Sequence, residues 1–298
     1  MAKFFCFENS NIVECESYPQ KFGMGVLSFS EAEKVGVSGL DEEFVRKLSA
    51  TKYTSYERKK DYQYIVLNTP ATQSVNQLHE KIVIFLDMRG VLVFSENGKT
   101  LSGLVGDFAQ KIKTPDIANF LSSFLLGLLS HDYIYIEGVE KDLGKIETEI
   151  ISTQKPNFPD KINKYRRKVA VIKRYYEQLY EVVEALGEEE WLLTASADFE
   201  KIKEKVKKLR EDSMYLRDYM SQIREAYQQA LDLSLNATMK FLSAVTLVFS
   251  PLTFLVGWYG MNFDIPESKL ANGYVIPIVL SIVIIGVTVW LFKRKKWF

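Results

Sequence analysis

The sequence predicts an α+β membrane protein in which a soluble α/β sandwich is followed by a long stalk helix and two C-terminal transmembrane helices. Three observations support this fold class: short apolar runs of strand length before residue 96, a charged stretch without proline or glycine after residue 197, and two uncharged apolar runs near the C-terminus. The 38 basic and 38 acidic residues balance, so the net charge indicates no nucleic-acid partner.

Residues 1–131 contain the strand-like runs and are predicted to form a cytoplasmic α/β domain. Strands are expected at Phe4–Phe7, Ile12–Cys15, Val26–Phe29, Gln63–Asn68, Ile82–Asp87 and Val91–Ser95. The last two would form a hairpin that turns at Met88-Arg89-Gly90. A helical pattern follows from about Asp116 to Ser130.

Side chains that carry chemistry are sparse in this domain. Cys6 and Cys15 lack the spacing of a zinc site, and two cysteines do not make a disulfide scaffold, so we expect reduced cytosolic thiols. His79 and His131 are isolated from other ligand-type residues. Because the sequence also lacks a Gly-rich phosphate loop, an HExxH motif and a nucleophile elbow, we expect neither enzymatic activity nor an organic cofactor.

Residues 132–196 are predicted to form antiparallel charged helices. Their expected bounds are Asp132–Ser152 and Pro159–Leu186, because "KPNFP" separates them and Gly187 ends the second. Glu188-Glu189-Glu190 is expected to cap the start of the next helix, with a tip that binds a divalent cation as the alternative.

The stalk helix is predicted at residues 197–240 and continues into the first membrane span without a helix breaker. Apolar or small residues recur along it in alternating steps of three and four, the a/d pattern of a packed seam. This seam consists of Phe199, Ile202, Val206, Leu209, Ser213, Leu216, Met220, Ile223, Tyr227, Ala230, Ser234, Ala237 and Phe241. A continuous helix from Phe199 to Gly260 would be ~90 Å long. Since a small domain cannot bury so long a seam, we expect the stalk to pack in part against copies of itself.

Two transmembrane helices are predicted, at residues 241–260 and 274–292, joined by an external loop at residues 261–273. Basic residues gather on one side of the spans: Lys240 precedes the first, and the tail 293–298 contains Lys293, Arg294, Lys295 and Lys296, whereas the loop between the spans has only Lys269. The positive-inside rule therefore predicts a multi-pass protein of the cell membrane, in contact with its lipids, with both termini in the cytoplasm.

A second stripe with the same alternation runs along the stalk and the first span. Its members are Asn236, Met239, Ser243, Thr246, Ser250, Thr253, Gly257 and Gly260. Small residues of this kind favour close helix packing in a bilayer. The same stripe could instead line a pore built from symmetric copies of one helix, and the residues alone leave both interpretations open.

The segment Asn236–Phe263, "NATMKFLSAVTLVFSPLTFLVGWYGMNF", resembles the CorA family of divalent-cation channels, which carry a Gly-Met-Asn signature at the outer end of the first span. The acidic loop and the closing "KRKKWF" match as well, and Lys52–Leu67 looks like the family's helix-then-strand segment. The resemblance implies a funnel-shaped homopentamer around a central pore. It also implies transport of Mg²⁺, with Co²⁺ and Ni²⁺ as further cations, and gating by cytoplasmic Mg²⁺.

The resemblance assigns roles to individual residues. Gly260, Met261 and Asn262 would form the outer selectivity ring. The pore below it would be lined by Asn236, Met239, Leu242, Thr246, Ser250 and Thr253. Within these sets, Asn262, Gly260, Thr253 and Asn236 would face the metal ion. Family members often have a larger apolar residue where Ser250 stands, and Lys201 lies near the expected position of a magnesium-sensing acid.

A neutral amide at the mouth of the pore suits Mg²⁺ chemically. Mg²⁺ gives up its water reluctantly, so Asn262 would hold the hydrated ion through its waters, whereas carboxylates would bind too tightly for conduction. Asp264 and Glu267, just outside, would raise the local cation concentration. The basic residues Lys293 to Lys296 would form an inner ring. Two alternatives are a zinc transporter of the same fold, disfavoured by the intact Gly-Met-Asn, and a membrane-anchored coiled-coil scaffold.

Overall fold

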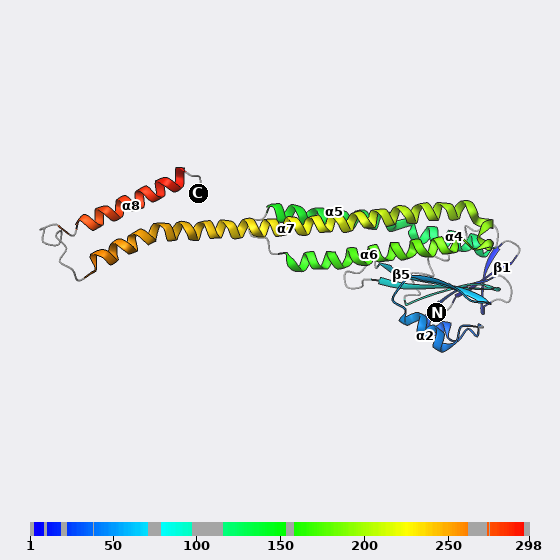
Figure 1. The fold of residues 1–298 in the computed structure, drawn as a ribbon. Helices are drawn as coiled ribbons and strands as arrows, with labels where there is room; N and C mark the ends of the chain where they lie inside the picture. The colour runs from blue at the N-terminus through cyan, green and yellow to red at the C-terminus, as the bar shows by residue number, and fades with distance from the viewer. Residues whose placement is uncertain are drawn as a thin grey trace. The chain divides into compact units, whose positions relative to one another are not determined.

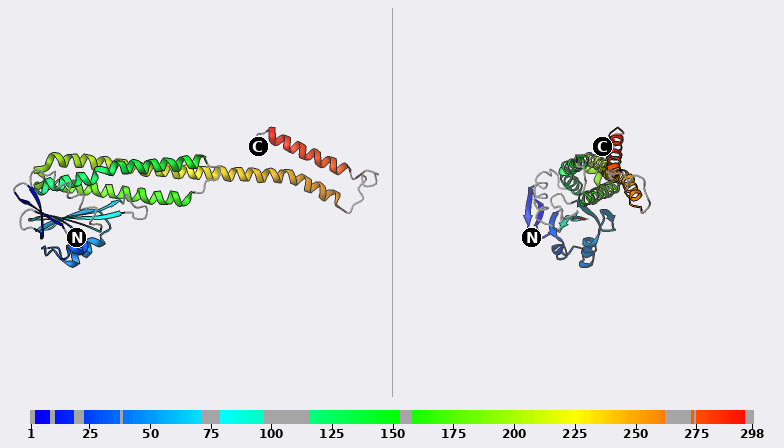
Figure 2. Two further views of the ribbon diagram at one scale, coloured as in Figure 1. Left: turned by 180° about the vertical axis from the view of Figure 1, so that it is seen from behind. Right: turned by 90° about the vertical axis from the view of Figure 1, so that its left-hand side faces the viewer.

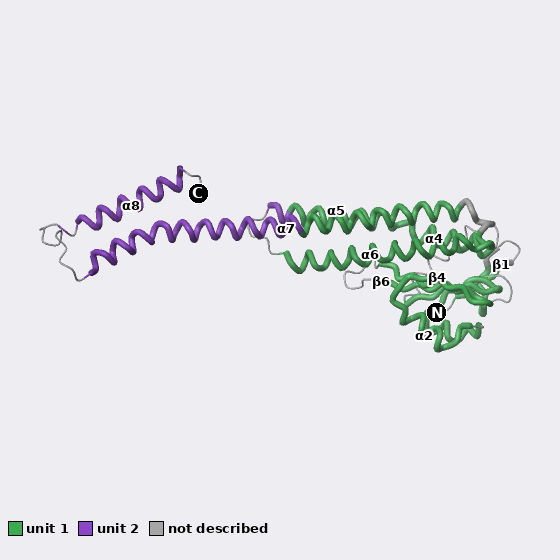
Figure 3. The backbone as a smooth tube through the Cα atoms, in the orientation of Figure 1, with its two compact units in different colours: residues 1–148, 158–224 green, residues 149–157, 225–298 purple. Residues whose placement is uncertain are grey.

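The computed structural model describes residues 3–8, 11–18, 23–37, 39–70, 79–96, 116–152, 158–261, 273 and 275–294. The chain divides into two compact units (Figure 3). One contains residues 1–148 and 158–224, and the other contains residues 149–157 and 225–298. Each unit is described by itself.

The first unit contains a seven-stranded mixed sheet. Its strands are β1 (Lys3–Glu8), β2 (Asn11–Cys15), β3 (Gly23–Ser28), β4 (Ser55–Arg58), β5 (Tyr62–Pro70), β6 (His79–Asp87) and β7 (Gly90–Ser95). They follow the spatial order β2-β1-β3-β7-β6-β5-β4, in which only the β3–β7 pair is parallel. The six strands expected from the sequence are confirmed, with ends that shift by up to three residues.

Both faces of this sheet are buried. Alternate residues such as Val66 and Phe85 pack in one core with Val45 and Leu48 of α2 (Glu42–Ala50), next to the short helix α1 (Phe29–Ala32). The residues between them, including Ile65, are also buried. Helices α4 and α6 lie on the opposite side of the sheet from α2 (Figure 1). The central strands are therefore continuous apolar runs rather than polar–apolar alternations.

The β6–β7 hairpin confirms the predicted turn. The Asp87 carboxylate accepts hydrogen bonds from the backbone N–H groups of Arg89, at 2.8 Å, and Gly90, at 3.0 Å. Gly90 has φ of 151°, and a Cβ at this position would lie 1.9 Å from the carbonyl oxygen of Gly23. Only glycine allows β3 to approach the start of β7 this closely.

The helix-then-strand expectation for Lys52–Leu67 is wrong in its helical part, while its strand is confirmed as β5. This segment forms β4 and β5, which pair antiparallel with Ser55 opposite Val66, and the helix α2 ends before it at Ala50. The turn between the strands closes where the N–H of Lys59 donates to the carbonyl of Tyr62 at 2.8 Å. β4 lies at the edge of the sheet, so it can be polar and still gain its main-chain hydrogen bonds from β5.

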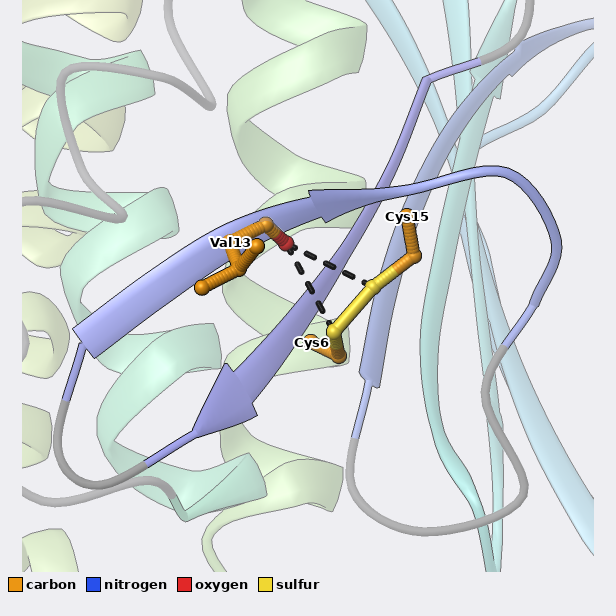
Figure 4. Close-up of a disulfide and its surroundings, with 3 residues drawn as sticks. All are labelled: Cys6, Val13 and Cys15. Atoms are coloured by element: carbon orange, nitrogen blue, oxygen red, sulfur yellow. Dashed lines mark hydrogen bonds between the residues drawn. A yellow bond between two sulfur atoms is a disulfide. The ribbon is translucent and has the colours of Figure 1, made fainter.

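The expectation of reduced thiols is also wrong, because Cys6 and Cys15 form a disulfide (Figure 4). In the β1–β2 register Cys6 lies opposite Val13 and Cys15 opposite Phe4, so the two cysteines are diagonal neighbours with Cα atoms 6.3 Å apart. Both sulfur atoms lie near the Val13 carbonyl oxygen, at 3.7 and 3.5 Å. The disulfide ties the edge strand β2 to the rest of the sheet through β1.

After the sheet come α4 (Ile117–Leu128) and the 3₁₀ turn η1 (Leu129–His131). Three long helices follow: α5 (Asp132–Ser152), α6 (Pro159–Leu186) and α7 (Ser196–Tyr259), with the 3₁₀ turn η2 (Glu190–Ala195) between α6 and α7. The part of α7 up to Arg224 belongs to the first unit. The predicted bounds of α5 and α6 are confirmed exactly as Asp132–Ser152 and Pro159–Leu186. The views of Figures 1 and 2 show these three helices side by side within the unit.

Polar contacts join the three helices. The Tyr165 hydroxyl donates to Asp142 at 2.9 Å between α6 and α5, and the Tyr219 hydroxyl donates to Glu147 at 2.6 Å between α7 and α5. Arg210 of α7 lies over the Tyr180 ring of α6 at 4.7 Å. The first part of the predicted seam is buried between these helices. It comprises Phe199, Ile202, Val206, Leu209, Ser213, Leu216, Met220 and Ile223.

Candidate pore-forming helix

In the second unit, α7 continues to Tyr259 and α8 (Val275–Arg294) follows. Both helices are long and apolar enough to cross a membrane. Large apolar side chains are exposed along them, including Phe249 at 60%, Phe254 at 72% and Ile282 at 64%. Such a surface is unfavourable in water, so lipid or other copies of the chain must cover it.

Every described member of the polar stripe is exposed. The exposed members are Asn236, Met239, Ser243, Thr246, Ser250, Thr253, Gly257 and Gly260. Leu242, which the resemblance also assigns to the pore, is exposed as well. Among the described residues between Lys240 and Lys293, the only ionisable side chain is that of Tyr259. The stripe is thus a line of neutral polar groups and small residues on an otherwise apolar helix.

The threonines of the stripe have a defined hydrogen-bonding direction. The Thr246 hydroxyl donates to the carbonyl of Leu242 at 3.0 Å, and the Thr253 hydroxyl donates to the carbonyl of Phe249 at 2.9 Å. Because each hydroxyl proton is used inside the helix, only the oxygen lone pairs remain for an outside partner. Both side chains therefore present acceptors, which suit the waters of a hydrated cation.

Two features mark the outer part of α7. Pro251 stands inside the helix and has no N–H to donate to the carbonyl of Leu247. Gly260 follows the last helical residue, and its N–H donates to the carbonyl of Val256 at 2.9 Å. A Cβ on Gly260 would lie 3.0 Å from that same oxygen, but its φ is not in the left-handed region. Close packing at the helix end, rather than a left-handed turn, is the local reason for glycine here.

The predicted residues at the ends of the spans are only partly described. Met261 lies directly after Gly260 in a bend and is 46% exposed. Lys293 and Arg294 stand in the last turn of α8, where basic side chains oppose the negative end of the helix dipole. Asn262, Asp264, Glu267, Lys295 and Lys296 lie outside the described residues.

The seam of α7 changes its surroundings in the second unit. Ala237 and Phe241 are exposed, and a groove of about 910 Å³ runs along this part of the helix. The groove is apolar apart from a few hydroxyl and amide groups. It is lined by Ile150, Ile151, Ala226, Gln229, Ala230, Leu233, Ser234, Ala237, Thr238 and Phe241. The seam pattern thus continues past the point where the chain's own helices cover it.

Glu189 has a structural role that the sequence did not reveal. It is 8% exposed and accepts hydrogen bonds from Tyr56 at 2.6 Å, Arg58 at 2.9 Å and Gln63 at 3.3 Å. These contacts fasten the α6–η2 junction to β4 and β5. With its carboxylate used in this way, Glu189 is unsuited to a cation-binding tip. Its neighbours Glu188 and Glu190 are exposed, and nothing in "EEE" distinguishes the central residue.

The described residues contain no group of three or more His, Cys, Asp or Glu side chains able to hold a metal ion. Lys201, near the position expected for a sensing acid, pairs with Asp198 at 2.8 Å.

Comparisons with known proteins agree with this arrangement. A family model described as "CorA-like Mg2+ transporter protein" matches residues 32–294. The cobalt/magnesium transport protein CorA of Thermotoga maritima is 25% identical over 249 residues, covering 80% of this chain and 70% of the relative. The zinc transport protein ZntB of Pectobacterium atrosepticum is 20% identical over 224 residues, covering 73% and 65%.

A solved structure has the same fold over its whole length. The structure of the CorA magnesium transporter from Methanocaldococcus jannaschii matches with a TM-score of 0.81 at 17% identity, covering 100% of this chain and 99% of that one. At this identity the likeness concerns the fold.

Proposed function

Because this chain belongs to the CorA-like Mg2+ transporter family, we propose that it is a Mg²⁺ channel whose pore is lined by the polar stripe of α7. Five copies would surround the pore as a homopentamer in the cell membrane, with both termini on the cytoplasmic side. The observation that carries the proposal is the exposed line of acceptor groups on a helix that is otherwise uncharged and apolar. A single copy cannot enclose an ion with one stripe, whereas a symmetric ring can.

Selection would take place at Gly260, Met261 and Asn262. Mg²⁺ demands octahedral oxygen ligation and dehydrates slowly, so a ring of neutral amide oxygens would hold its hydration shell without stripping it. Asp264 and Glu267 would concentrate cations outside the ring. Below it, Thr253, Ser250, Thr246 and Asn236 would accept hydrogen bonds from the same hydration waters, with Met239 and Leu242 between them.

The cytoplasmic side would supply regulation. Lys293, Arg294, Lys295 and Lys296 would form a basic ring near the inner mouth and interact with lipid headgroups. Cytoplasmic Mg²⁺ would act as a gating ligand, and Co²⁺ and Ni²⁺ would share the pore. The membrane potential drives entry, at ~2.3 kcal/mol per charge per 100 mV.

The test is Mg²⁺ uptake into liposomes by the variant Asn262→Ala. We expect uptake to be abolished while the oligomer stays folded, because the amide ring is lost. Asn272→Ala, in the same predicted loop, is the matched control and should transport normally. Unchanged flux in Asn262→Ala would contradict the assignment of Asn262 to the selectivity ring. Thr253→Val removes a hydrogen-bond acceptor from the pore lining and should reduce flux.

A zinc transporter of the same fold is the second candidate, and the zinc-transporting relative favours it. The intact Gly-Met-Asn favours magnesium. Flux of Mg²⁺ against Zn²⁺, with and without a proton gradient, separates the two. A scaffold without transport activity would give no flux of either ion.

A further inference from the structure

The Cys6–Cys15 disulfide joins the first two strands of the sheet and lies at one of its edges (Figure 4). Both cysteines are only partly buried, so a small thiol in solution can reach the bond. β2 pairs with β1 on one side and with no other described strand, so the disulfide reinforces its single strand pairing. Neither cysteine belongs to the proposed pore.

Three residues after Cys15, the side chain of Tyr18 attaches the chain to the sheet a second time. The Tyr18 hydroxyl donates to the Asp87 carboxylate at 3.0 Å, and the Arg89 guanidinium lies 5.2 Å from the centre of the Tyr18 ring. Asp87 itself is fixed in the β6–β7 turn by the backbone N–H groups of Arg89 and Gly90. We call the contact of Tyr18 with Asp87 and Arg89 the Tyr18 anchor. It connects the segment after β2 to the turn between two other strands.

The disulfide and the Tyr18 anchor support each other. When the bond is closed, Cys15 is fixed to β1, and only Glu16 and Ser17 separate it from Tyr18. So short a tether leaves Tyr18 few positions other than the one at Asp87. When the bond is open, main-chain hydrogen bonds alone pair β2 with β1, and an edge strand held in this way frays more readily. The chain before Tyr18 then has more conformational freedom, so forming the anchor costs more entropy.

We propose that the Cys6–Cys15 disulfide is a redox switch that sets how firmly the Tyr18 anchor holds. Opening consumes two equivalents of a thiol reductant. The first thiolate attacks one cysteine sulfur, forms a mixed disulfide and releases the other cysteine as a thiolate. The second thiolate attacks the mixed disulfide, so the reductant leaves as its own disulfide. The two electrons end on Cys6 and Cys15, and each sulfur takes up one of the protons that the two thiols release.

The location of the bond in the cell makes both states accessible. This step rests on the proposed function, which places both termini, and with them β1 and β2, in the cytoplasm. Cytoplasmic thiols keep most cysteines reduced, and disulfides that form there usually act transiently, in catalysis or redox sensing. A partly buried disulfide at a sheet edge is open to exchange with these thiols. Oxidising conditions close it again, because the β1–β2 register keeps the two cysteines as diagonal neighbours.

The first experiment follows the bond in the folded, full-length protein in detergent. The protein is equilibrated with mixtures of reduced and oxidised glutathione, quenched with acid and alkylated, and mass spectrometry counts the free thiols. We expect an open bond in excess reduced glutathione and a closed bond in excess oxidised glutathione, with full reversal between them. A bond that stays in one state across all mixtures would overturn the proposal. Because no ion flux is measured, the outcome is independent of whether the protein transports Mg²⁺.

The second experiment measures the coupling between the bond and the anchor. Tyr18→Phe removes the anchoring hydroxyl and should lower the unfolding midpoint by about 2–4 °C while the bond is closed. The shift should be clearly smaller when the bond is open, either in excess dithiothreitol or in the variant that combines Cys6→Ser with Cys15→Ser. Tyr165→Phe is the matched control, since its hydroxyl donates to Asp142 at 2.9 Å, and its shift should not depend on the bond. Equal shifts for Tyr18→Phe in both states would overturn the proposal.

Hydrogen exchange locates the change within the sheet. Opening the bond should lower the protection of the backbone amides of residues 11–18 by roughly tenfold or more, because the loop-closure constraint is lost. The amides of β5, near the opposite edge of the same sheet, should keep their protection. Equal loss of protection in both places would mean that reduction destabilises the whole sheet rather than releasing the edge, and the proposed switch would be wrong.

Discussion

The two halves of the α7 seam carry the same alternation of apolar and small residues but differ in what covers them. From Phe199 to Ile223 the seam is buried by the chain's own helices. At Ala237 and Phe241 it is exposed beside an apolar groove. The comparison teaches that a heptad pattern specifies that a helix packs, whereas the partner depends on where the neighbouring helices end.

The end of α5 marks the change. α5 ends at Ser152, and Ile150 and Ile151 of its last turn line one side of the groove beside the later part of α7. An isolated helix gains little stability from propensity alone and relies on packing of its apolar face. The exposed half therefore calls for cover by another chain, which is consistent with the proposed homopentamer.

The largest effect is expected from Ala237→Asp, which places a charge on the exposed half of the seam. We expect the oligomer to dissociate to monomers in mild detergent, because a buried unpaired charge at each copy of the interface is unfavourable. Native mass measurement checks this. Gln228→Asp adds the same charge one position away from the seam and should leave the mass unchanged. An intact oligomer for Ala237→Asp would mean that copies do not cover the groove.

Leu216→Ala tests the buried half. Leu216 is fully buried, so its truncation should destabilise the first unit by about 2–5 kcal/mol. Because the chain's own helices cover this half, the loss should not depend on protein concentration. Leu235→Ala, at a residue 61% exposed, is the control and should change stability by less than about 0.5 kcal/mol. A stability loss for Leu216→Ala that depends on protein concentration would contradict the claim that the chain's own helices cover this half of the seam.

Glu189→Gln should weaken the contact between the α6–η2 junction and the sheet, just before the buried half of the α7 seam begins. The Glu189 carboxylate accepts hydrogen bonds from Tyr56, Arg58 and Gln63, and its replacement should lower the unfolding free energy by about 1–3 kcal/mol. Thermal unfolding of the matched variants Glu188→Gln and Glu190→Gln, both at exposed positions, should match the unmodified protein. Equal behaviour of all three variants would contradict the anchoring role.

The last prediction concerns pH. Burial raises the pKa of Asp132 from 3.8 to about 6, opposed by the Tyr176 hydroxyl, Lys205 and His131. The folded state therefore binds this proton more tightly than the unfolded state, and stability falls as the pH rises from about 4 to about 6. Asp132→Asn should be more stable than the unmodified protein at pH 8, with the difference closing towards pH 4. A difference independent of pH would exclude Asp132 as the cause.

The sequence predicted the helices best where composition marks their ends. Pro159 begins α6, and Gly187 stands directly after its last residue. By contrast, α2 is amphipathic but only nine residues long, and β4 is a short polar edge strand without an alternation of its own. The Cys6–Cys15 bond depends on the register of two paired strands, which composition does not fix.

The candidate site was predictable to a similar extent. The spacing of Thr246 and Thr253 identified the stripe, and α7 exposes both residues. The hydrogen bonds that the two hydroxyl groups donate, and the contacts that distinguish Glu189 from Glu188 and Glu190, could be identified only from the three-dimensional structure. The ring at Asn262 remains a prediction, because a one-chain pattern contains no information on how symmetric copies meet.

Pro251 has a mechanical consequence for α7. A helix resists bending through its ladder of hydrogen bonds, and the rung from Leu247 is missing at this proline. The helix is therefore easier to bend at Pro251 than elsewhere. A movement of the stalk along the helix axis would then tilt the segment between Pro251 and Gly260. In the proposed homopentamer, a tilt of these segments would change the width of the outer pore opening, so bending at Pro251 would couple the stalk to that opening.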